Sequence, residues 1–218
     1  MKKNSISIWE AENIFYQKSN ISRIGKLIYH YEIYNIIKNL PGDILEFGVF
    51  KGSSLIRFMT FRSILENNYS RKIYGFDTFN KFPSQKRRDD KKLRKNFTKD
   101  AGNPITKKKL NEILLEKKFE NFELIEGDVL KTLDKFLKKN PNLKISLLHL
   151  DMDVYNSTKF VINKLKDKIV KKGIILVDDY GTVEGATKVI DNFLVKNKKL
   201  ELKKLSFYKV PSYIVKNF

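Results

Sequence analysis

Five short runs of apolar residues recur along the chain, and a stretch with helical spacing follows four of them. The apolar runs cover residues 44–49, 72–77, 122–128, 145–151 and 173–179. The stretches with apolar residues three or four positions apart cover residues 53–66, 129–139, 157–169 and 184–196. Continuous apolar runs are typical of buried parallel strands, and their alternation with helices indicates βαβ units. The pattern therefore predicts an α/β fold in which helices cover both faces of a mostly parallel sheet.

Both ends of the chain add elements to this core. Residues 22–40 carry apolar positions three and four apart, which predicts a helix that ends at Pro41 and Gly42. Residues 1–20 are polar with scattered aromatic side chains and predict a loosely helical arm. Residues 200–216 hold two β-like runs, which predict a closing antiparallel pair and bring the expected sheet to seven strands. We expect a helical arm over residues 1–40, packed on a single domain over residues 41–218.

A basic segment at 84–109 interrupts the alternation, with eleven basic and three acidic side chains. It predicts a lid over a site or a solvated loop. The whole chain carries a formal net charge of +19, which either indicates a polyanionic partner or reflects biased composition. Only seven of its 44 basic residues are arginine, the residue that nucleic-acid binders use for bidentate contacts. Biased composition is therefore the favoured explanation.

Composition excludes several classes of protein. The 218 residues include no cysteine, so disulfide scaffolds, cysteine-ligated metal centres and cysteine nucleophiles are ruled out. No apolar run approaches the roughly 20 residues that span a bilayer. Glu10 lies where the apolar stretch of a secretion signal would run. We expect a cytoplasmic protein without a membrane span.

Every predicted core strand ends in an acidic residue. These residues are Glu46, Asp77, Asp128, Asp151, Asp178 and Asp179. A single aspartate in such a place is often only a helix cap. Ligands of open α/β sheets bind at the carboxyl ends of the strands, so the full set predicts a ligand site at that edge.

The turn after the first strand, from Glu46 to Ser54, has the pattern E-x-G-x-x-x-G. Glycines let the backbone approach a ligand closely, and the next helix begins where an anionic group is favoured. The turn matches neither the dinucleotide fingerprint nor the P-loop, which disfavours NAD and ATP. S-adenosylmethionine, with a carboxylate, a ribose and an adenine but no phosphate, fits better. Its ribose hydroxyls would then lie at Asp77 and its adenine near Asp128.

The fourth and fifth strands deliver a second group of acids, Asp151 and Asp153 with Asp178 and Asp179. These two motifs contain no lysine or arginine. Carboxylates that converge without a positively charged side chain need a bound cation. All-oxygen ligands favour a hard ion, Mg²⁺ first, with Ca²⁺ or Mn²⁺ as alternatives. The competing interpretation is that Asp153 and Asp179 cap helices and that no metal binds.

Five motifs in this order resemble the macrocin O-methyltransferase family, the TylF/MycF-type sugar O-methyltransferases. They are P-G-D-I-L-E-F-G-V-F-K-G-S-S from Pro41, G-F-D-T-F-N-K-F-P from Gly75, G-D-V from Gly127, L-D-M-D-V-Y-N-S-T from Leu150 and V-D-D-Y from Val177. The resemblance covers residues 41–191. It implies a Rossmann-like class I methyltransferase fold, S-adenosylmethionine and Mg²⁺ as cofactors, and a sugar or glycoside as the small-molecule substrate.

The resemblance also implies roles for individual residues. The cofactor would contact Glu46, Gly48, Val49, Gly52, Ser53, Ser54, Asp77, Thr78, Asp128 and Val129. The metal would be bound by Asp151, Asp178 and Asp179. The family often has Gly-Gly-Ser where this chain has Gly52-Ser53-Ser54, and the basic segment leaves the identity of the substrate open. Catechol-type relatives place a lysine where this chain has Val154, so that base is excluded.

The expected reaction is direct methyl transfer to a metal-bound hydroxyl, with Asp151 or Asp153 as the catalytic base. His149 competes for that role, but strand alternation favours a structural histidine, and His30 is interpreted in the same way. Tyr155 and Tyr180 are candidates either for the acceptor pocket or for packing.

Two other functions remain as alternatives. An RNA methyltransferase would explain the charge, although the chain lacks the Asn-Pro-Pro-aromatic motif that resembles base N-methylation. A non-catalytic interaction module on a methyltransferase fold is the other alternative. We expect no specific nucleic-acid partner, and self-association through the arm around Trp9, Phe15 and Tyr16 is a further expectation. The sequence names neither the sugar nor its hydroxyl.

Overall fold

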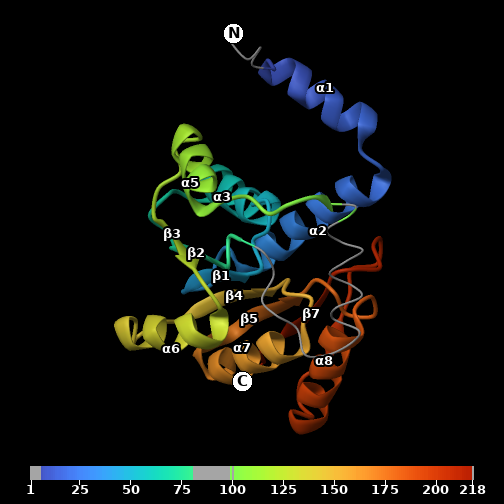
Figure 1. Ribbon diagram of the computed structural model, residues 1–218. Helices are drawn as coiled ribbons and strands as arrows, with labels where there is room; N and C mark the ends of the chain where they lie inside the picture. Colours follow the sequence, from blue (N-terminus) through green and yellow to red (C-terminus); the bar gives the residue numbers. More distant parts are fainter. Residues whose placement is uncertain (1–5, 81–98, 100, 218) are drawn as a thin grey trace.

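Seven strands form one sheet in the computed structural model, which describes residues 6–80, 99 and 101–217 (Figure 1). The strands are β1 (Asp43–Phe47), β2 (Ile73–Asp77), β3 (Phe122–Glu126), β4 (Ile145–Leu150), β5 (Ile169–Val177), β6 (Leu202–Lys203) and β7 (Ser212–Val215). Their order is β3-β2-β1-β4-β5-β7-β6. Strands β1 to β5 pair in parallel, and β7 pairs antiparallel with both β5 and β6. The predicted α/β fold, with its closing antiparallel pair, is confirmed.

Helices cover both faces of this sheet (Figure 1). They are α2 (Ile21–Ile37), α3 (Ser53–Leu65), α5 (Lys107–Glu116), α6 (Val129–Lys139), α7 (Tyr155–Leu165) and α8 (Glu184–Lys196), with a 3₁₀ turn at Lys166–Lys168, whereas α1 (Ile8–Lys18) packs on neither face. One apolar core joins α2, α3 and α5 to the sheet, and a second joins α6, α7 and α8 to the other face. Successive residues of β1 supply both cores, because Ile44 points into the first and Leu45 into the second. A strand that is buried on both faces has to be apolar throughout, which is the pattern seen in the sequence.

The order of the strands places a crevice at one edge. The chain starts at β1 in the middle of the sheet, moves outward through β2 to β3, and then returns to form β4 on the other side of β1. Connections from β1 and β4 therefore leave in opposite directions. The carboxyl ends of these two strands border the gap in which ligands of such sheets bind.

Two buried arginines stabilise the edge of the sheet at which the strands begin, opposite the crevice. Arg62 donates hydrogen bonds to the backbone carbonyls of Arg71, Glu120 and Asn121. Arg71 pairs with Glu66 at 2.7 Å and also donates to the Ser146 hydroxyl and to several carbonyls. A buried guanidinium needs such partners. Two of the seven arginines thus stabilise the fold through hydrogen bonds to the backbone.

The N-terminal region consists of two unlike helices. Helix α2 packs on the sheet and buries five residues, among them Tyr29 and Ile33. Helix α1 lies away from the sheet (Figure 1) and buries no residue. Its residues Ile8 and Trp9 are 85% and 77% exposed. Self-association through this arm stays a prediction, which sizing of a variant without residues 1–20 would check. No helix in the described part of the chain is long and apolar enough to cross a membrane.

Two elements depart from the expected boundaries. The sequence did not predict helix α5, because it begins with three lysines and only Leu110 and Leu114 on it are buried. Strand β5 begins at Ile169, four residues earlier than the apolar run indicates, because the exposed pair Lys171 and Lys172 hides its start. Of the basic segment, residues 107–109 belong to α5, and most of the remainder lies outside the described residues.

Candidate active site at the carboxyl edge of the sheet

A cavity of about 750 Å³ opens where the strands end. Its walls come from the turn after β1, the ends of β2 and β3, and the loops after β4 and β5, with α2 and the end of α1 on one side. Most of the predicted site residues line it: Gly48, Val49, Ser53, Ser54, Asp77, Thr78, Asp128, Val129, Asp151, Asp153, Asp178 and Asp179. The sequence-based prediction that these strand ends share one site agrees with this arrangement.

Two predicted cofactor residues, Glu46 and Gly52, are not among the residues that line the cavity. Glu46 is fully buried, and one of its carboxylate oxygens accepts a hydrogen bond of 2.7 Å from the Ser54 hydroxyl. Gly52 has a φ of +82°, and a Cβ there would lie 2.5 Å from the side chain of Leu110 in α5. Both residues support the wall of the cavity from behind.

The glycine turn is held in shape by Asp77. One carboxylate oxygen accepts hydrogen bonds from the backbone N–H groups of Val49 at 2.7 Å and Phe50 at 2.8 Å. The other accepts from the backbone N–H of Phe79 at 2.9 Å and from the Thr78 hydroxyl at 3.3 Å. Four bonds use about all the accepting capacity of one carboxylate. A ribose hydroxyl at Asp77 would therefore replace the longest of them, the bond from Thr78.

Gly48 brings the two halves of the edge together. Its φ is +93°, and a Cβ on it would lie 1.7 Å from the backbone oxygen of Asp151. No other residue fits such an approach. The chain thus passes from β1 into the turn directly against the loop that follows β4.

Helices begin at the cavity in two different ways. Asp128 caps α6 and accepts a hydrogen bond of 3.0 Å from the backbone N–H of Leu130. Gly52 precedes α3 and supplies no side-chain cap, so the first N–H groups of α3 lack that partner. Free N–H groups at a helix start are a favourable site for a carboxylate.

Three aspartates converge on the other side of the cavity. Asp151, Asp153 and Asp179 each place a carboxylate oxygen within 4.8 Å of the others. Burial and the neighbouring Asp178 raise the pKa of Asp151 to about 8. Burial also raises the pKa of Asp153, and burial with Asp153 and Asp151 raises that of Asp179 well above its ordinary value. The cluster therefore favours a cation, and three carboxylates are a donor set that suits Mg²⁺.

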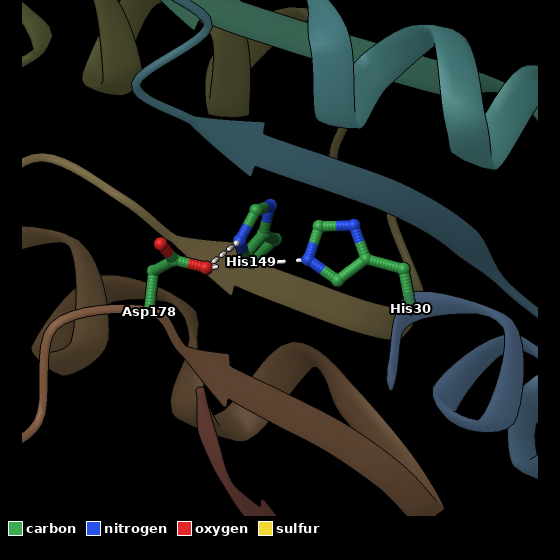
Figure 2. Close-up of side chains that lie close together, drawn as sticks. All are labelled: His30, His149 and Asp178. Atoms are coloured by element: carbon green, nitrogen blue, oxygen red, sulfur yellow. Dashed lines mark ion pairs between the residues drawn. The ribbon is translucent and has the colours of Figure 1, made fainter. Parts of the chain in front are cut away.

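Asp178, the third predicted metal ligand, has other partners. One of its carboxylate oxygens accepts a hydrogen bond from the ammonium of Lys26 in α2. The other lies 3.5 Å from His149 Nε2 and 4.0 Å from His30 Nε2 (Figure 2). Burial alone would raise the pKa of Asp178, but Lys26 and His149 outweigh it and hold that pKa below its ordinary value. The structure gathers Asp153, rather than Asp178, with Asp151 and Asp179.

The two histidines lie behind the wall of the cavity, and neither is among the residues that line it. His149 Nδ1 is 3.6 Å from Glu46, on the side of the ring opposite Asp178. Burial lowers the pKa of His149, but contacts with Asp178 and Glu46 raise it to about 10. Burial and His149 lower the pKa of His30, which stacks on Phe58 with ring centroids 5.0 Å apart. Their position supports the structural interpretation over a role as base. Tyr155 and Tyr180 pack against the apolar core and are also absent from the cavity lining.

Sequence reasoning missed the cations of the site. Arg23, Lys26 and Arg57 line the cavity from α2 and α3. Asp151 and Asp178 outweigh the effect of burial and raise the pKa of Lys26. The available signal was the spacing of Lys26 and His30, which lie four residues apart on one face of the predicted helix.

Known proteins share this sequence pattern and this fold. The profile of the macrocin-O-methyltransferase (TylF) family matches residues 24–205. The chain is 25% identical, over 73% of its length, to an 8-demethyl-8-(2,3-dimethoxy-α-L-rhamnosyl)-tetracenomycin-C 4′-O-methyltransferase from Streptomyces olivaceus. It is 25% identical, over 72% of its length, to a demethyldecarbamoylnovobiocin O-methyltransferase from Streptomyces niveus. The chain spans 60% of the length of each of these two relatives.

A solved structure agrees over nearly the whole chain. The crystal structure of a calicheamicin methyltransferase superposes with a TM-score of 0.78 at 25% identity, over 97% of this chain and 87% of that one. The apo structure of the same enzyme, a TDP-rhamnose 3′-O-methyltransferase, superposes with a TM-score of 0.74 at 25% identity, over 97% of this chain and 88% of that one.

Proposed function

The chain belongs to the macrocin O-methyltransferase (TylF) family, and from this premise we propose that it methylates a hydroxyl of a sugar or glycosylated small molecule. The methyl donor would be S-adenosylmethionine, and the reaction would depend on Mg²⁺. The observation that carries the proposal is the division of one cavity into a glycine turn with a helix start and a facing group of three aspartates. The cytoplasmic location expected from the sequence stays a prediction.

The wall formed by the glycine turn fits the proposed cofactor. Gly48 exposes its backbone to the cavity, and the uncapped start of α3 offers N–H groups for the carboxylate of the methionine part. Thr78 and Asp128 line the same wall, where a ribose and an adenine would follow. Asp77 would hold the turn in place. The Thr78 hydroxyl, which now donates to Asp77, would give up this hydrogen bond to a ribose hydroxyl.

The wall formed by the aspartates fits the proposed metal. Asp151, Asp153 and Asp179 lie close enough to hold Mg²⁺ together, and Asp178, which the resemblance implies as a ligand, lies beside them with its Lys26 partner and stays a predicted ligand. S-adenosylmethionine, when bound, supplies a methyl group on a positively charged sulfur, and Mg²⁺, when bound, lowers the pKa of a hydroxyl that contacts it. Asp151 or Asp153 would accept the proton of the acceptor hydroxyl as the new carbon–oxygen bond forms and the carbon–sulfur bond breaks. The rigid strand ends would contribute by aligning the reacting atoms.

The relatives and the cations of the cavity support a sugar acceptor, including one that carries a phosphate. One relative acts on a rhamnosyl-tetracenomycin and another protein of the same fold on TDP-rhamnose. Arg23 and Arg57 line the cavity, and neither forms an ion pair with another residue that the structure describes. A diphosphate would match two such guanidinium groups.

The proposal is tested by transfer from methyl-labelled S-adenosylmethionine. TDP-rhamnose, a rhamnosylated aromatic glycoside and total RNA are offered to the purified chain in separate reactions, with Mg²⁺ or with EDTA. We expect label in one or both sugar acceptors with Mg²⁺ only. Label in RNA alone would favour the nucleic-acid alternative, and no transfer to any acceptor would favour the non-catalytic module.

A further inference from the structure

The cavity wall formed by α2 and the end of α1 changes in chemistry along its length. Four side chains of this wall line the cavity at intervals of three or four residues: Phe15, Ser19, Arg23 and Lys26. Each interval is about one helical turn, so the four follow one another along the wall. Lys26 contacts Asp178 beside the aspartate cluster. The wall therefore leads away from the aspartates through a guanidinium and a hydroxyl to an aromatic ring.

Two of the four cationic side chains that line the cavity have no partner in the described part of the chain. The four are Arg23, Lys26, Lys51 and Arg57. Lys26 pairs with Asp178, and Lys51 donates a hydrogen bond of 2.6 Å to a backbone carbonyl. No side-chain hydrogen bond or ion pair joins Arg23 or Arg57 to any residue that the structure describes. The described residues thus leave two positive charges in the cavity uncompensated.

Arg23 and Arg57 reach the cavity from different helices. Arg57, on α3, is half-buried, and Arg23, on α2, is exposed. Burial and the positive charge of Arg23 lower the pKa of Arg57, whereas Asp178 and Glu46 act in the opposite direction. Two guanidinium groups that repel each other favour an anion between them. The planar set of N–H donors on a guanidinium matches the oxygens of a phosphate, so a phosphate is the anion that this pair suits best.

The proposed cofactor does not supply that anion. The carboxylate of S-adenosylmethionine is balanced by its amino group, and its sulfonium adds a further positive charge. The methyl donor as a whole is therefore a cation, and the uncapped start of α3 is available for its carboxylate. The acceptor is the remaining source of negative charge in this cavity.

The far end of the wall carries an aromatic ring. Phe15 is half-buried, whereas every other residue of α1 is exposed, and Ser19 just after the helix is half-buried as well. The side of α1 that carries Phe15 is thus the side that faces the cavity. Nucleobases stack on such rings, and a serine hydroxyl is able to bond a ribose.

We propose that the acceptor is a nucleotide-activated sugar, whose diphosphate is bound by Arg57 and Arg23 and whose base packs against Phe15. This inference rests on the proposed function and narrows it, because a finished neutral glycoside offers no charge to the two arginines. The sugar lies at the aspartates, and the diphosphate, ribose and base follow along α2 and α1. The product is then a methylated nucleotide sugar, which a reaction of the glycosyl-transfer class consumes.

The first experiment measures binding without catalysis. The nucleoside diphosphates TDP, UDP and GDP, the nucleoside thymidine and inorganic diphosphate are titrated calorimetrically into the chain. EDTA is present, so that Mg²⁺ does not link phosphates to the aspartates. We expect at least one nucleoside diphosphate to bind, and thymidine to bind at least about tenfold more weakly than TDP, because it lacks charge-assisted hydrogen bonds. Binding of none of the three diphosphates, or equal binding of thymidine, would overturn the proposal.

The second experiment places the ligand with variants. Arg57→Gln and Arg23→Gln should each weaken binding of the nucleoside diphosphate by about tenfold. Phe15→Ala should weaken it too but leave binding of inorganic diphosphate unchanged. Lys188→Gln is the matched control, because it removes one positive charge from an exposed position on α8 outside the cavity lining. An equal loss in Lys188→Gln would assign binding to the net charge of the chain and overturn the proposal. If Arg57→Gln fails to fold, the variant of the exposed Arg23 decides.

The third experiment separates the acceptor from the cofactor by steady-state kinetics. In Arg57→Gln the KM for TDP-rhamnose should rise by about tenfold, while kcat and the KM for S-adenosylmethionine stay at their wild-type values. A rise in the KM for S-adenosylmethionine alone would assign Arg57 to the cofactor and overturn the proposal. Transfer to a neutral rhamnoside as efficient as transfer to TDP-rhamnose would overturn it as well and leave the proposed function intact. Binding of nucleoside diphosphates without any methyl transfer would contradict the proposed function and leave the anion site intact.

Discussion

The two halves of the sheet edge use the same residue type in opposite ways. In the turn half, Asp77 and Asp128 accept hydrogen bonds from backbone N–H groups that need acceptors. In the cluster half, Asp151, Asp153 and Asp179 face one another, and their pKa values are raised. Carboxylates with donors stabilise the loops, whereas carboxylates that repel one another need a bound cation. The two roles are thus separated by hydrogen-bond partners and not by position in the sequence.

The largest expected effect comes from removing one carboxylate of the cluster half. Asp179→Asn should lower Mg²⁺-dependent methyl transfer by at least about a hundredfold, because a bound metal contributes several kcal/mol to the transition state. Its free energy of unfolding in the absence of metal should stay equal or rise, because one of three repelling charges is gone. Turnover and urea denaturation of the same preparation measure both. Asp134→Asn, which alters only an exposed pair with Lys164, is the control. Full activity in Asp179→Asn would contradict the assignment.

A substitution in the turn half should show the opposite pattern. It should lower the stability of the fold, whereas a substitution in the cluster half lowers activity and leaves stability unchanged or higher. Asp77→Asn leaves one accepting oxygen where two now accept four hydrogen bonds. We expect the free energy of unfolding to fall by about 1–3 kcal/mol, since buried donors lose their acceptor. Affinity for S-adenosylmethionine should fall with it, because the turn loosens. If Asp77→Asn unfolds at the wild-type urea concentration, the distinction between the halves is wrong.

The smallest effect is expected at Asp128, where a single cap is lost. Asp128→Ala should cost about 1 kcal/mol, the usual value for an N-cap. It should leave Mg²⁺ binding unchanged, because the residue belongs to the turn half. Thermal unfolding with and without Mg²⁺ measures both. A reduced Mg²⁺ affinity in Asp128→Ala would contradict the prediction that the two halves of the edge act independently.

The strands and their acidic ends could be predicted because both depend on local pattern. A strand buried on both faces must be apolar, and the residue that follows it lies at the edge whatever the rest of the chain does. The interaction partners of the acidic side chains could not be predicted in the same way. Asp178 and Asp179 are adjacent in the sequence, yet one faces Lys26 and the histidines and the other faces Asp151 and Asp153.

Contacts between distant segments set the limit of the prediction. Lys26 and Asp178 are 152 positions apart, and nothing local indicates that α2 passes the ends of β4 and β5. Helix α5 was missed for a related reason, because only two of its side chains reach the core. The resemblance implies Glu46 as a cofactor residue, which stays a prediction, whereas its contacts with Ser54 at 2.7 Å and His149 at 3.6 Å could not be read from the sequence.

The two halves of the sheet edge should bind two different ligands independently. Calorimetric titration of S-adenosylmethionine into the purified chain, once with Mg²⁺ and once with EDTA, tests it most directly. We expect cofactor binding of similar affinity in both conditions, together with Mg²⁺ binding that is lost in Asp179→Asn and kept in Asp128→Ala. Absence of cofactor binding in both conditions would contradict the account.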